Sequence, residues 1–353
     1  MDDDSDPEIL TPKQVRAARA LLAWSQRDLA RAADVATSTV ADFERGQRTP
    51  VANSAQAIRN ALEKAGIRFL PTGAVIGQLV SIPKASDRSG APVRWISAED
   101  LSSWADRIDG AASLPTLISH LIRATLGAAV QLRFPSDEGV RYSGWDGRTS
   151  TEIASLYVPQ GEAAWEIGAQ RSDIGTKAGE DYRKRTKTPA LLDPTNAAFV
   201  FVTPRHWPNK DVWAKARQDE GPWREVRAYD ASDLVHWIEQ TPAVGLWLAV
   251  RLGKRPPGTR ELEDVWTEWS LATQWPITEE LVLSDRDQDA AEVHRWLRGA
   301  PSVLSLRATT TDEVVAFFHA TLTELPDDQA DACRTRCIVA TTAESARGLD
   351  DAS

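Results

Sequence analysis

The sequence predicts a multi-domain protein of mixed class: an all-α head, an α/β core with a central mixed sheet, and a partial α/β C-terminal domain. Three observations support this fold class. The chain has 353 residues, a length typical of two or three domains. Its first 70 residues show helical periodicity broken by short turns, whereas residues 114–250 alternate between helical and strand-like runs. Residues 255–353 alternate in the same way but stop soon after a strand-like run.

Composition and charge favour a cytoplasmic protein with no membrane contact. No apolar run approaches the ~20 residues that a membrane-spanning helix needs, and the acidic start, MDDDSDPE, is neither a signal nor a transit peptide. Cys333 and Cys337 are interpreted as packed thiols of a reducing compartment, in preference to a metal-binding pair. The net charge is −10, yet residues 11–70 carry twice as many Lys and Arg as Asp and Glu. This distribution favours a local contact with DNA.

The head is expected at residues 11–70, after an acidic, disordered tail at 1–10. Thr11, Pro12 and Gln14 form a capping box with proline at the first helical position. Further helices are expected at 26–33, 37–44 and 52–65. Ser25 is the expected N-cap of the helix at 26–33, and the helix at 52–65 is expected to stop at Gly66.

The words S-Q-x-D-L-A and F-E-R-G-Q-R-T-P fall within residues 11–66, which resemble the Cro/C1-type (XRE-family) helix-turn-helix. The resemblance implies that the helix from Thr37 to Glu44 enters the major groove of double-stranded DNA. Ala41 and Asp42 depart from the long polar residues usual in that helix, so a bundle for protein contacts or dimerisation stays the alternative. The implied DNA contacts are Thr37, Ser38 and Thr39 toward bases or phosphates, and Gln26, Arg45 and Arg48 toward the backbone.

Residues 71–113 are expected to be a linker with one short helix at 96–108, because Pro, Gly and Ser punctuate them. The core domain is then expected at 114–254. Its helices are predicted at 115–126, 177–187, 212–217, 234–240 and 242–252, and its strand-like runs at 130–134, 139–142, 153–158, 163–169, 197–202 and 225–229.

Two acidic residues of the core domain suggest chemistry. Asp146 lies between glycines after a strand-like run, and Glu166 lies inside a short apolar run expected to be a buried strand. A carboxylate in a buried strand is costly unless a cation meets it. Two of them on neighbouring strands would make a hard-oxygen site for Mg²⁺. Asp146 by itself reads equally well as a turn residue, and the basic run 177–187 could be a solvated helix face that pairs Asp181 with Arg185.

The words G-W-D-G, V-P-x-G-x-x-x-W-E and K-A-x-x-D-Y-x-K-R-T, in this order, resemble the PD-(D/E)-x-K restriction-endonuclease-like fold. They are most similar to the Mrr-like modules that head large bacterial defence-type NTPase proteins. The resemblance implies Mg²⁺-assisted hydrolysis of DNA phosphodiesters, with Asp146, Glu166 and the carbonyl of Ile167 holding the metal.

This sequence departs from the family at the lysine usually found two residues after the glutamate, where it has Gly168. Gln170 could orient the water instead, and Lys177 could reach in from the next helix. The family often takes a further acid from the first helix, and 115–126 contains none. Arg183, Lys184 and Arg185 are expected to face the DNA backbone.

Residues 255–353 resemble the opening of an α/β nucleotide-binding domain in a degenerate form. Strands are expected at 281–283, 302–306 and 337–340. After Leu306 the chain reads R-A-T-T-T-D-E in place of a glycine-rich phosphate-binding loop, so no nucleotide site is inferred.

The sequence therefore predicts a DNA-binding protein with a Mg²⁺-dependent endonuclease-like domain, of an anti-phage defence or restriction type. The alternative is a non-catalytic regulator or sensor that retains the nuclease fold only to bind DNA. Gly168, which stands where the family has a lysine, favours this alternative. An interaction scaffold is a third reading, favoured by the acidic body and the 14 Trp. A homodimer, further C-terminal domains and a partner subunit all stay open.

Overall fold

The computed structural model divides into two compact units, residues 1–88 with 273–321 and residues 89–272 with 322–353. It describes residues 10–22, 24–48, 50–65, 67–69, 75–77, 94–134, 144–190 and 192–350. Residues 1–9 of the predicted tail at 1–10, the helix stop at Gly66, most of the linker and the strand-like run at 139–142 lie outside these described residues. Leu10, assigned to the disordered tail, is buried in the core of the head, so the tail was predicted too long by that residue.

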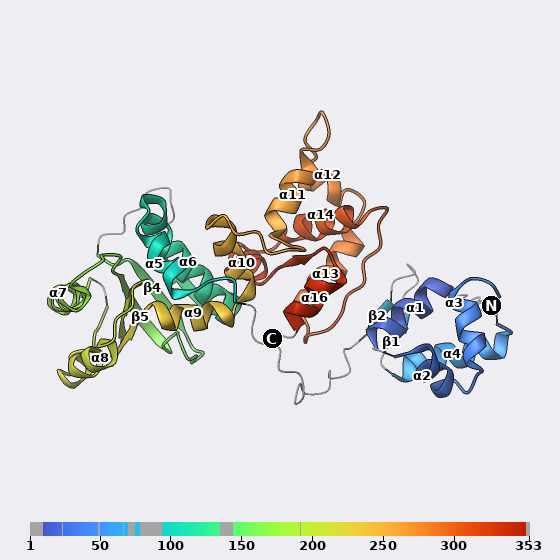
Figure 1. Ribbon diagram of the computed structural model, residues 1–353, viewed down its shortest axis with the longest axis horizontal. Helices are drawn as coiled ribbons and strands as arrows, with labels where there is room; N and C mark the ends of the chain where they lie inside the picture. The colour runs from blue at the N-terminus through green and yellow to red at the C-terminus, as the bar shows by residue number, and fades with distance from the viewer. Residues whose placement is uncertain are drawn as a thin grey trace, which may run out of the picture. The chain divides into compact units, whose positions relative to one another are not determined.

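The head consists of short helices around one small core (Figure 1). Its elements are α1 (Pro12–Leu21), α2 (Gln26–Ala32), α3 (Thr37–Glu44) and α4 (Ala52–Lys64), with the antiparallel pair β1 (Ile67–Phe69) and β2 (Val75–Gly77). Ser25 caps α2, as predicted, by accepting a hydrogen bond from the backbone N–H of Asp28. Leu29, Val40 and Phe43 are buried together in this core.

The other stretch of the first unit is helical where strands were predicted. Its helices are α12 (Glu279–Leu283), α13 (Asp287–Arg298) and α14 (Thr311–Leu322). The predicted strand at 281–283 is wrong, because Glu279 and Glu280 stabilise the first turn of a helix there and Leu281 is exposed. The predicted strand at 302–306 is reduced to one bridge residue, Val303.

The second unit is built on a five-stranded mixed sheet of order β3-β4-β5-β6-β7. The first three strands are antiparallel neighbours, and the last two continue the sheet in parallel. The strands are β3 (Val130–Arg133), β4 (Gly147–Thr151), β5 (Gly161–Ile167), β6 (Ala198–Val202) and β7 (Glu225–Tyr229).

Helices cover both faces of this sheet, and alternation along each strand decides which residues meet them. Trp165 belongs to the core shared with α6 (Ile108–Leu126) and α9 (Ala231–Glu239). Its neighbour Ala164, with Phe199 and Phe201 of β6, packs with α7 (Ile174–Lys187) and α8 (Lys210–Asp219). Figure 1 shows α7 and α8 on the opposite side of the sheet from α5 (Ala98–Ala105), α6 and α9. Glu166 follows Ala164 by two residues, so it points toward α7.

The helices of this unit are α5 (Ala98–Ala105), α6 (Ile108–Leu126), α7 (Ile174–Lys187), α8 (Lys210–Asp219), α9 (Ala231–Glu239), α10 (Pro242–Arg251), α11 (Leu262–Ser270), α15 (Asp327–Arg334) and α16 (Ala343–Asp350), and a short 3-10 turn (Gly127–Ala129) follows α6. No helix in the described part of the chain combines the length and apolar character that crossing a bilayer requires.

The strand predicted at 153–158 is wrong. The strand lies earlier, as β4, and its buried face carries Thr149 and Thr151. Ile153 and Leu156, which suggested a strand, are exposed in the following loop. Polar β-branched residues thus form the buried strand, and the apolar run does not.

The C-terminal end of the chain packs with the sheet unit. The two-residue strand β8 (Thr259–Arg260) pairs antiparallel with β9 (Val339–Ala340), and Arg336 donates a hydrogen bond to the carbonyl of Ala124 at 2.7 Å. The two compact units therefore divide the chain differently from the predicted domain at 255–353, and β9 is shorter than the strand predicted at 337–340.

The buried Arg205 connects the loop after β6 to two other segments. Its guanidinium donates to the carbonyls of Ala169 (2.8 and 3.1 Å) and Ser102 (2.6 Å) and to Asp106 (2.7 Å). Arg171 donates to the same Asp106, but from an exposed position.

We expect Arg205→Gln to lower the free energy of unfolding by about 2–3 kcal/mol, because it leaves buried carbonyls without their charged donor. Urea denaturation followed by circular dichroism measures the change. The matched control is Arg171→Gln, which removes an exposed partner of Asp106 and should leave the midpoint nearly unchanged. Equal losses in the two variants would contradict the assignment.

Candidate functional site

Asp146 and Glu166 lie side by side where β4 and β5 meet. Asp146 immediately precedes Gly147, the first residue of β4, and Gly147 pairs with Trp165 of β5. The antiparallel register therefore puts Asp146 opposite Glu166. The Oδ2 atom of Asp146 accepts a hydrogen bond from the backbone N–H of Ile167 at 2.8 Å. The two acids that the sequence singled out are neighbours, and Asp146 is bonded to the main chain of the third predicted metal-binding residue.

Burial and mutual repulsion perturb both carboxyl groups. Glu166 is only 3% exposed. Its burial and the carboxylate of Asp146 act to raise the pKa of Glu166, and the charge and hydrogen bond of Arg185 act to lower it. Burial also raises the pKa of Asp146, against the effect of the hydrogen bond from Ile167. Neighbouring carboxyl groups perturbed in this way mark a candidate functional site.

Helix α7 turns a charged stripe toward these acids. Lys177, Asp181 and Arg185 follow at intervals of four residues and so lie along one side of the helix. The Nζ of Lys177 donates to Asp181 at 2.7 Å, and the Nε of Arg185 donates to Oε1 of Glu166 at 2.5 Å. The helix is therefore not the solvated face that would pair Asp181 with Arg185.

Asp181 is a residue of this site that sequence reasoning missed. It is buried, and its Oδ2 has no hydrogen-bond partner within the described residues. Its negative charge acts to raise the pKa of both Asp146 and Glu166. The spacing of four residues from Lys177 and Arg185 was the signal that could have identified it.

Lys177 lies within electrostatic reach of the acids. Burial acts to lower its pKa, but the hydrogen bond to Asp181 and the charges of Glu166 and Asp146 raise the pKa of Lys177 above its ordinary value. The lysine therefore stays protonated at neutral pH. The structure brings this predicted site residue together with the acids.

The surroundings of Gly168, the position where the resemblance implies a lysine, are tightly packed. A Cβ atom at this position would lie 2.6 Å from Cζ of Phe201, too close unless something moves. Gln170, the predicted substitute, lies next to it, with Oε1 3.1 Å from the same point. Its amide nitrogen is buried and lacks a hydrogen-bond partner among the described residues.

The three basic residues predicted to face DNA do not share one environment. Arg183 and Lys184 are exposed on α7. Arg185 is turned inward, with a side chain 12% exposed, and its guanidinium lies 4.8 Å from the ring centroid of Trp145. The ion pair with Glu166 occupies it, so this geometry does not present Arg185 to a DNA backbone.

The carboxylate oxygens of Asp146 and Glu166 suit a divalent cation that takes only a few of its ligands from the protein. Among the described residues, no three His, Cys, Asp or Glu side chains come together closely enough to hold a metal. Mg²⁺, however, often binds through one or two carboxylates and keeps several waters. Asp146 and Glu166 supply two hard oxygen donors whose repulsion a cation would relieve.

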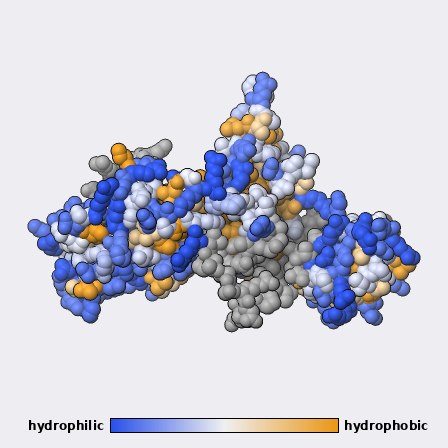
Figure 2. Space-filling model, in the orientation of Figure 1, coloured by the Kyte–Doolittle hydropathy of each residue, from blue (hydrophilic) through white to orange (hydrophobic). Residues whose placement is uncertain are grey.

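The predicted DNA-contacting residues of the head are distributed around α3. Thr37, Ser38, Arg45 and Arg48 are exposed and Thr39 is half-buried. The visible face of the head is mostly hydrophilic (Figure 2). Arg45 folds back on its own helix, pairing with Asp42 at 3.1 Å.

Gln26 is held by an internal network. Its amide nitrogen donates to Oε2 of the buried Glu44 at 2.7 Å. Arg19 donates to both carboxylate oxygens of Glu44, at 2.8 and 3.1 Å. This network joins α1, α2 and α3, so Gln26 helps to fix the position of α3 and is not free to contact a DNA backbone.

Residues 15–65 match the helix-turn-helix family. The match confirms the predicted XRE-type head and indicates DNA binding by this part of the chain. No curated protein and no solved structure matches the chain.

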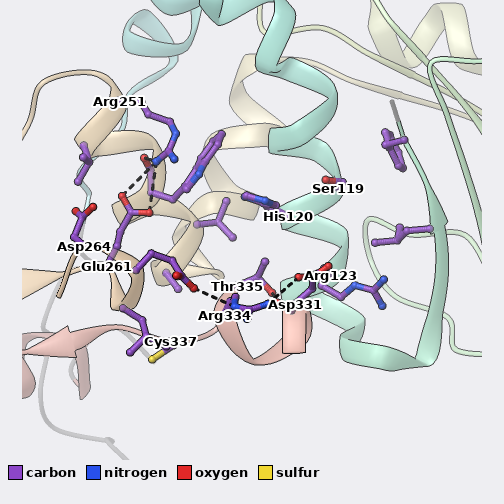
Figure 3. A pocket seen from close by; sticks show the side chains of 18 residues that line it. Ser119, His120, Arg123, Arg251, Glu261, Asp264, Asp331, Arg334, Thr335 and Cys337 are labelled. Atoms are coloured by element: carbon purple, nitrogen blue, oxygen red, sulfur yellow. Dashed lines mark hydrogen bonds and ion pairs between the residues drawn. The ribbon is translucent and has the colours of Figure 1, made fainter. Parts of the chain in front are cut away.

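A separate cavity of about 900 Å³ lies among α6, α10, the start of α11 and α15 (Figure 3). His120 points into it from α6, edge-on to the ring of Trp247, and burial lowers the pKa of His120 to about 4. The cavity is of ligand size, and of its lining residues only Cys337 was singled out from the sequence, as a packed thiol. Its charged groups pair with one another, Arg251 with Glu261 at 3.3 Å and Arg334 with Asp331 at 3.5 Å.

Proposed function

We propose that the chain is a DNA-binding protein whose sheet unit is a Mg²⁺-dependent DNA nuclease of the restriction-endonuclease-like type. The observation that carries the proposal is that Asp146 and Glu166 lie side by side and that α7, which packs over them, contributes Lys177. The order of elements α6-β3-β4-β5-α7-β6 supports it, because this is the order the family resemblance implies. A defence or restriction role would follow from the same resemblance.

In this proposal each residue has a definite task. Asp146 and Glu166 hold the metal, together with the main chain of Ile167. Mg²⁺, when bound, lowers the pKa of a water and offsets charge that develops on the phosphate. Lys177, kept protonated by its acidic neighbours, binds the phosphate undergoing attack. Gln170, with its unbonded amide, orients the water.

Asp181 acts through Lys177 and is a positioning residue. Its hydrogen bond at 2.7 Å restricts the long lysine side chain to one direction. The head contributes by holding the duplex near the unit that carries this site, which raises the local concentration of substrate.

A second candidate is a non-catalytic regulator or sensor that binds DNA through the head. Two observations favour it: Phe201 fills the space beside Gly168, and Arg185 already satisfies Glu166. A buried ion pair of this kind can serve structure alone.

We expect the purified full-length protein to nick or linearise plasmid DNA with Mg²⁺ and to lose this activity with EDTA. Asp146→Asn and Glu166→Gln should each reduce cleavage by at least about a hundredfold, since each removes a metal-binding oxygen. Glu162→Gln, an exposed position on the same strand, is the matched control and should retain activity.

Intact plasmid under Mg²⁺ and Mn²⁺, with DNA binding retained, would favour the regulator. Cleavage that survives in both Asp146→Asn and Glu166→Gln would assign the activity to another site or to a contaminant.

DNA binding by the head predicts a salt effect. Arg48→Gln should weaken binding to duplex DNA and reduce the slope of log K against log salt by about one, because one phosphate contact is lost. Fluorescence anisotropy between low and moderate salt measures both. Lys64→Gln, at the end of α4, is the control and should keep the wild-type slope; an unchanged slope in Arg48→Gln would remove this residue from the interface.

A further inference from the structure

Arg185 is bonded inside the proposed metal site. It comes from the same helix face as Lys177, but it reaches the carboxylate of Glu166 instead of solvent. Both partners are largely buried, with side chains 12% and 4% exposed. The guanidinium lies over the ring of Trp145, 4.8 Å from its centroid.

The pairing of charges explains why this cation is needed. Three carboxylates, Asp146, Glu166 and Asp181, meet two cations at this site. Lys177 is bonded to Asp181, which leaves Arg185 as the direct counter-ion of Glu166. A carboxylate buried without a counter-ion is strongly disfavoured.

A divalent cation on Asp146 and Glu166 would compete with this arrangement. It would need lone pairs of Glu166, one of whose oxygens already accepts from Arg185. It would also place positive charge next to the guanidinium, which is repulsive. A metal and Arg185 therefore act as alternatives at Glu166.

We propose that Arg185 is a built-in counter-ion that neutralises Glu166 until a divalent cation replaces it, an inference that rests on the proposed metal site. Once released, the guanidinium is free to bind a phosphate of the DNA in a two-pronged manner. Metal and DNA would then strengthen each other's binding. The metal releases Arg185 from Glu166 so that Arg185 can bind a phosphate, and a phosphate bound to Arg185 leaves Glu166 free to bind the metal.

Direct binding of Mn²⁺ to the full-length protein tests this without relying on cleavage. Free Mn²⁺ is counted by electron paramagnetic resonance for the wild type, Arg185→Gln, Asp146→Asn and Lys187→Gln. We expect Arg185→Gln to bind Mn²⁺ about tenfold or more tightly than the wild type. Lys187→Gln, which removes an exposed charge from the same helix, should match the wild type, and Asp146→Asn should lose binding.

The outcomes separate the two ideas. Equal Mn²⁺ affinity in the wild type and Arg185→Gln, with binding lost in Asp146→Asn, would overturn the role of Arg185 and leave the metal site standing. No Mn²⁺ binding by any of the proteins would overturn the metal site and the counter-ion role with it.

A measurement on the wild type covers the case in which Arg185→Gln fails to fold. In protein labelled with ¹⁵N-arginine, the Nε–H of Arg185, identified with Arg185→Lys, should give a slowly exchanging signal without metal. Addition of Mg²⁺ should abolish that signal. A signal unchanged at saturating Mg²⁺ would show that the ion pair persists and would refute the exchange.

Discussion

The sheet unit depends on how negative charge is buried beneath α7. Glu166 is directed to this face by the alternation of β5, and Asp146 is brought to it by the register of β4. Two carboxylates in one buried place lose hydration and repel each other, so the fold must bring positive charge to them. A single helix does so, because Lys177 and Arg185 are separated by two intervals of four residues and lie on one side of it.

The packing of Phe201 connects the core to the chemistry. This ring belongs to the apolar layer between the sheet and α7, and it occupies the space into which a side chain at residue 168 would extend. A lysine at position 168 would require this ring to move. The cations of this site come instead from the helix, where Lys177 is supported by Asp181.

Much of this fold was readable from the sequence, and the failures have physical causes. The apolar run of β6 predicted that strand closely, and the strand expected at 225–229 is β7. The proximity of Asp146 and Glu166 was expected from the family resemblance, and the register of β4 and β5 places the two residues opposite each other. The strand β4 was missed because its buried residues are threonines. The direction of Arg185 was not predictable, since basic residues occupy more than one side of α7 and tertiary packing selects which side faces inward. The cavity near His120 is assembled from segments far apart in sequence, so local patterns carry no sign of it.

The chain as a whole is acidic, so contact with DNA has to depend on where its cations are exposed. Helix α7 is organised accordingly: Arg183, Lys184 and Lys187 are exposed, while Arg185 is committed to Glu166. A phosphate backbone approaching this helix would first meet the exposed cations, whose hydration is easily exchanged. Arg185 could join them only after another cation takes its place, because an uncompensated Glu166 would be left behind. In the proposed function, the same buried carboxylate thus sets both the affinity for metal and the number of cations available to DNA.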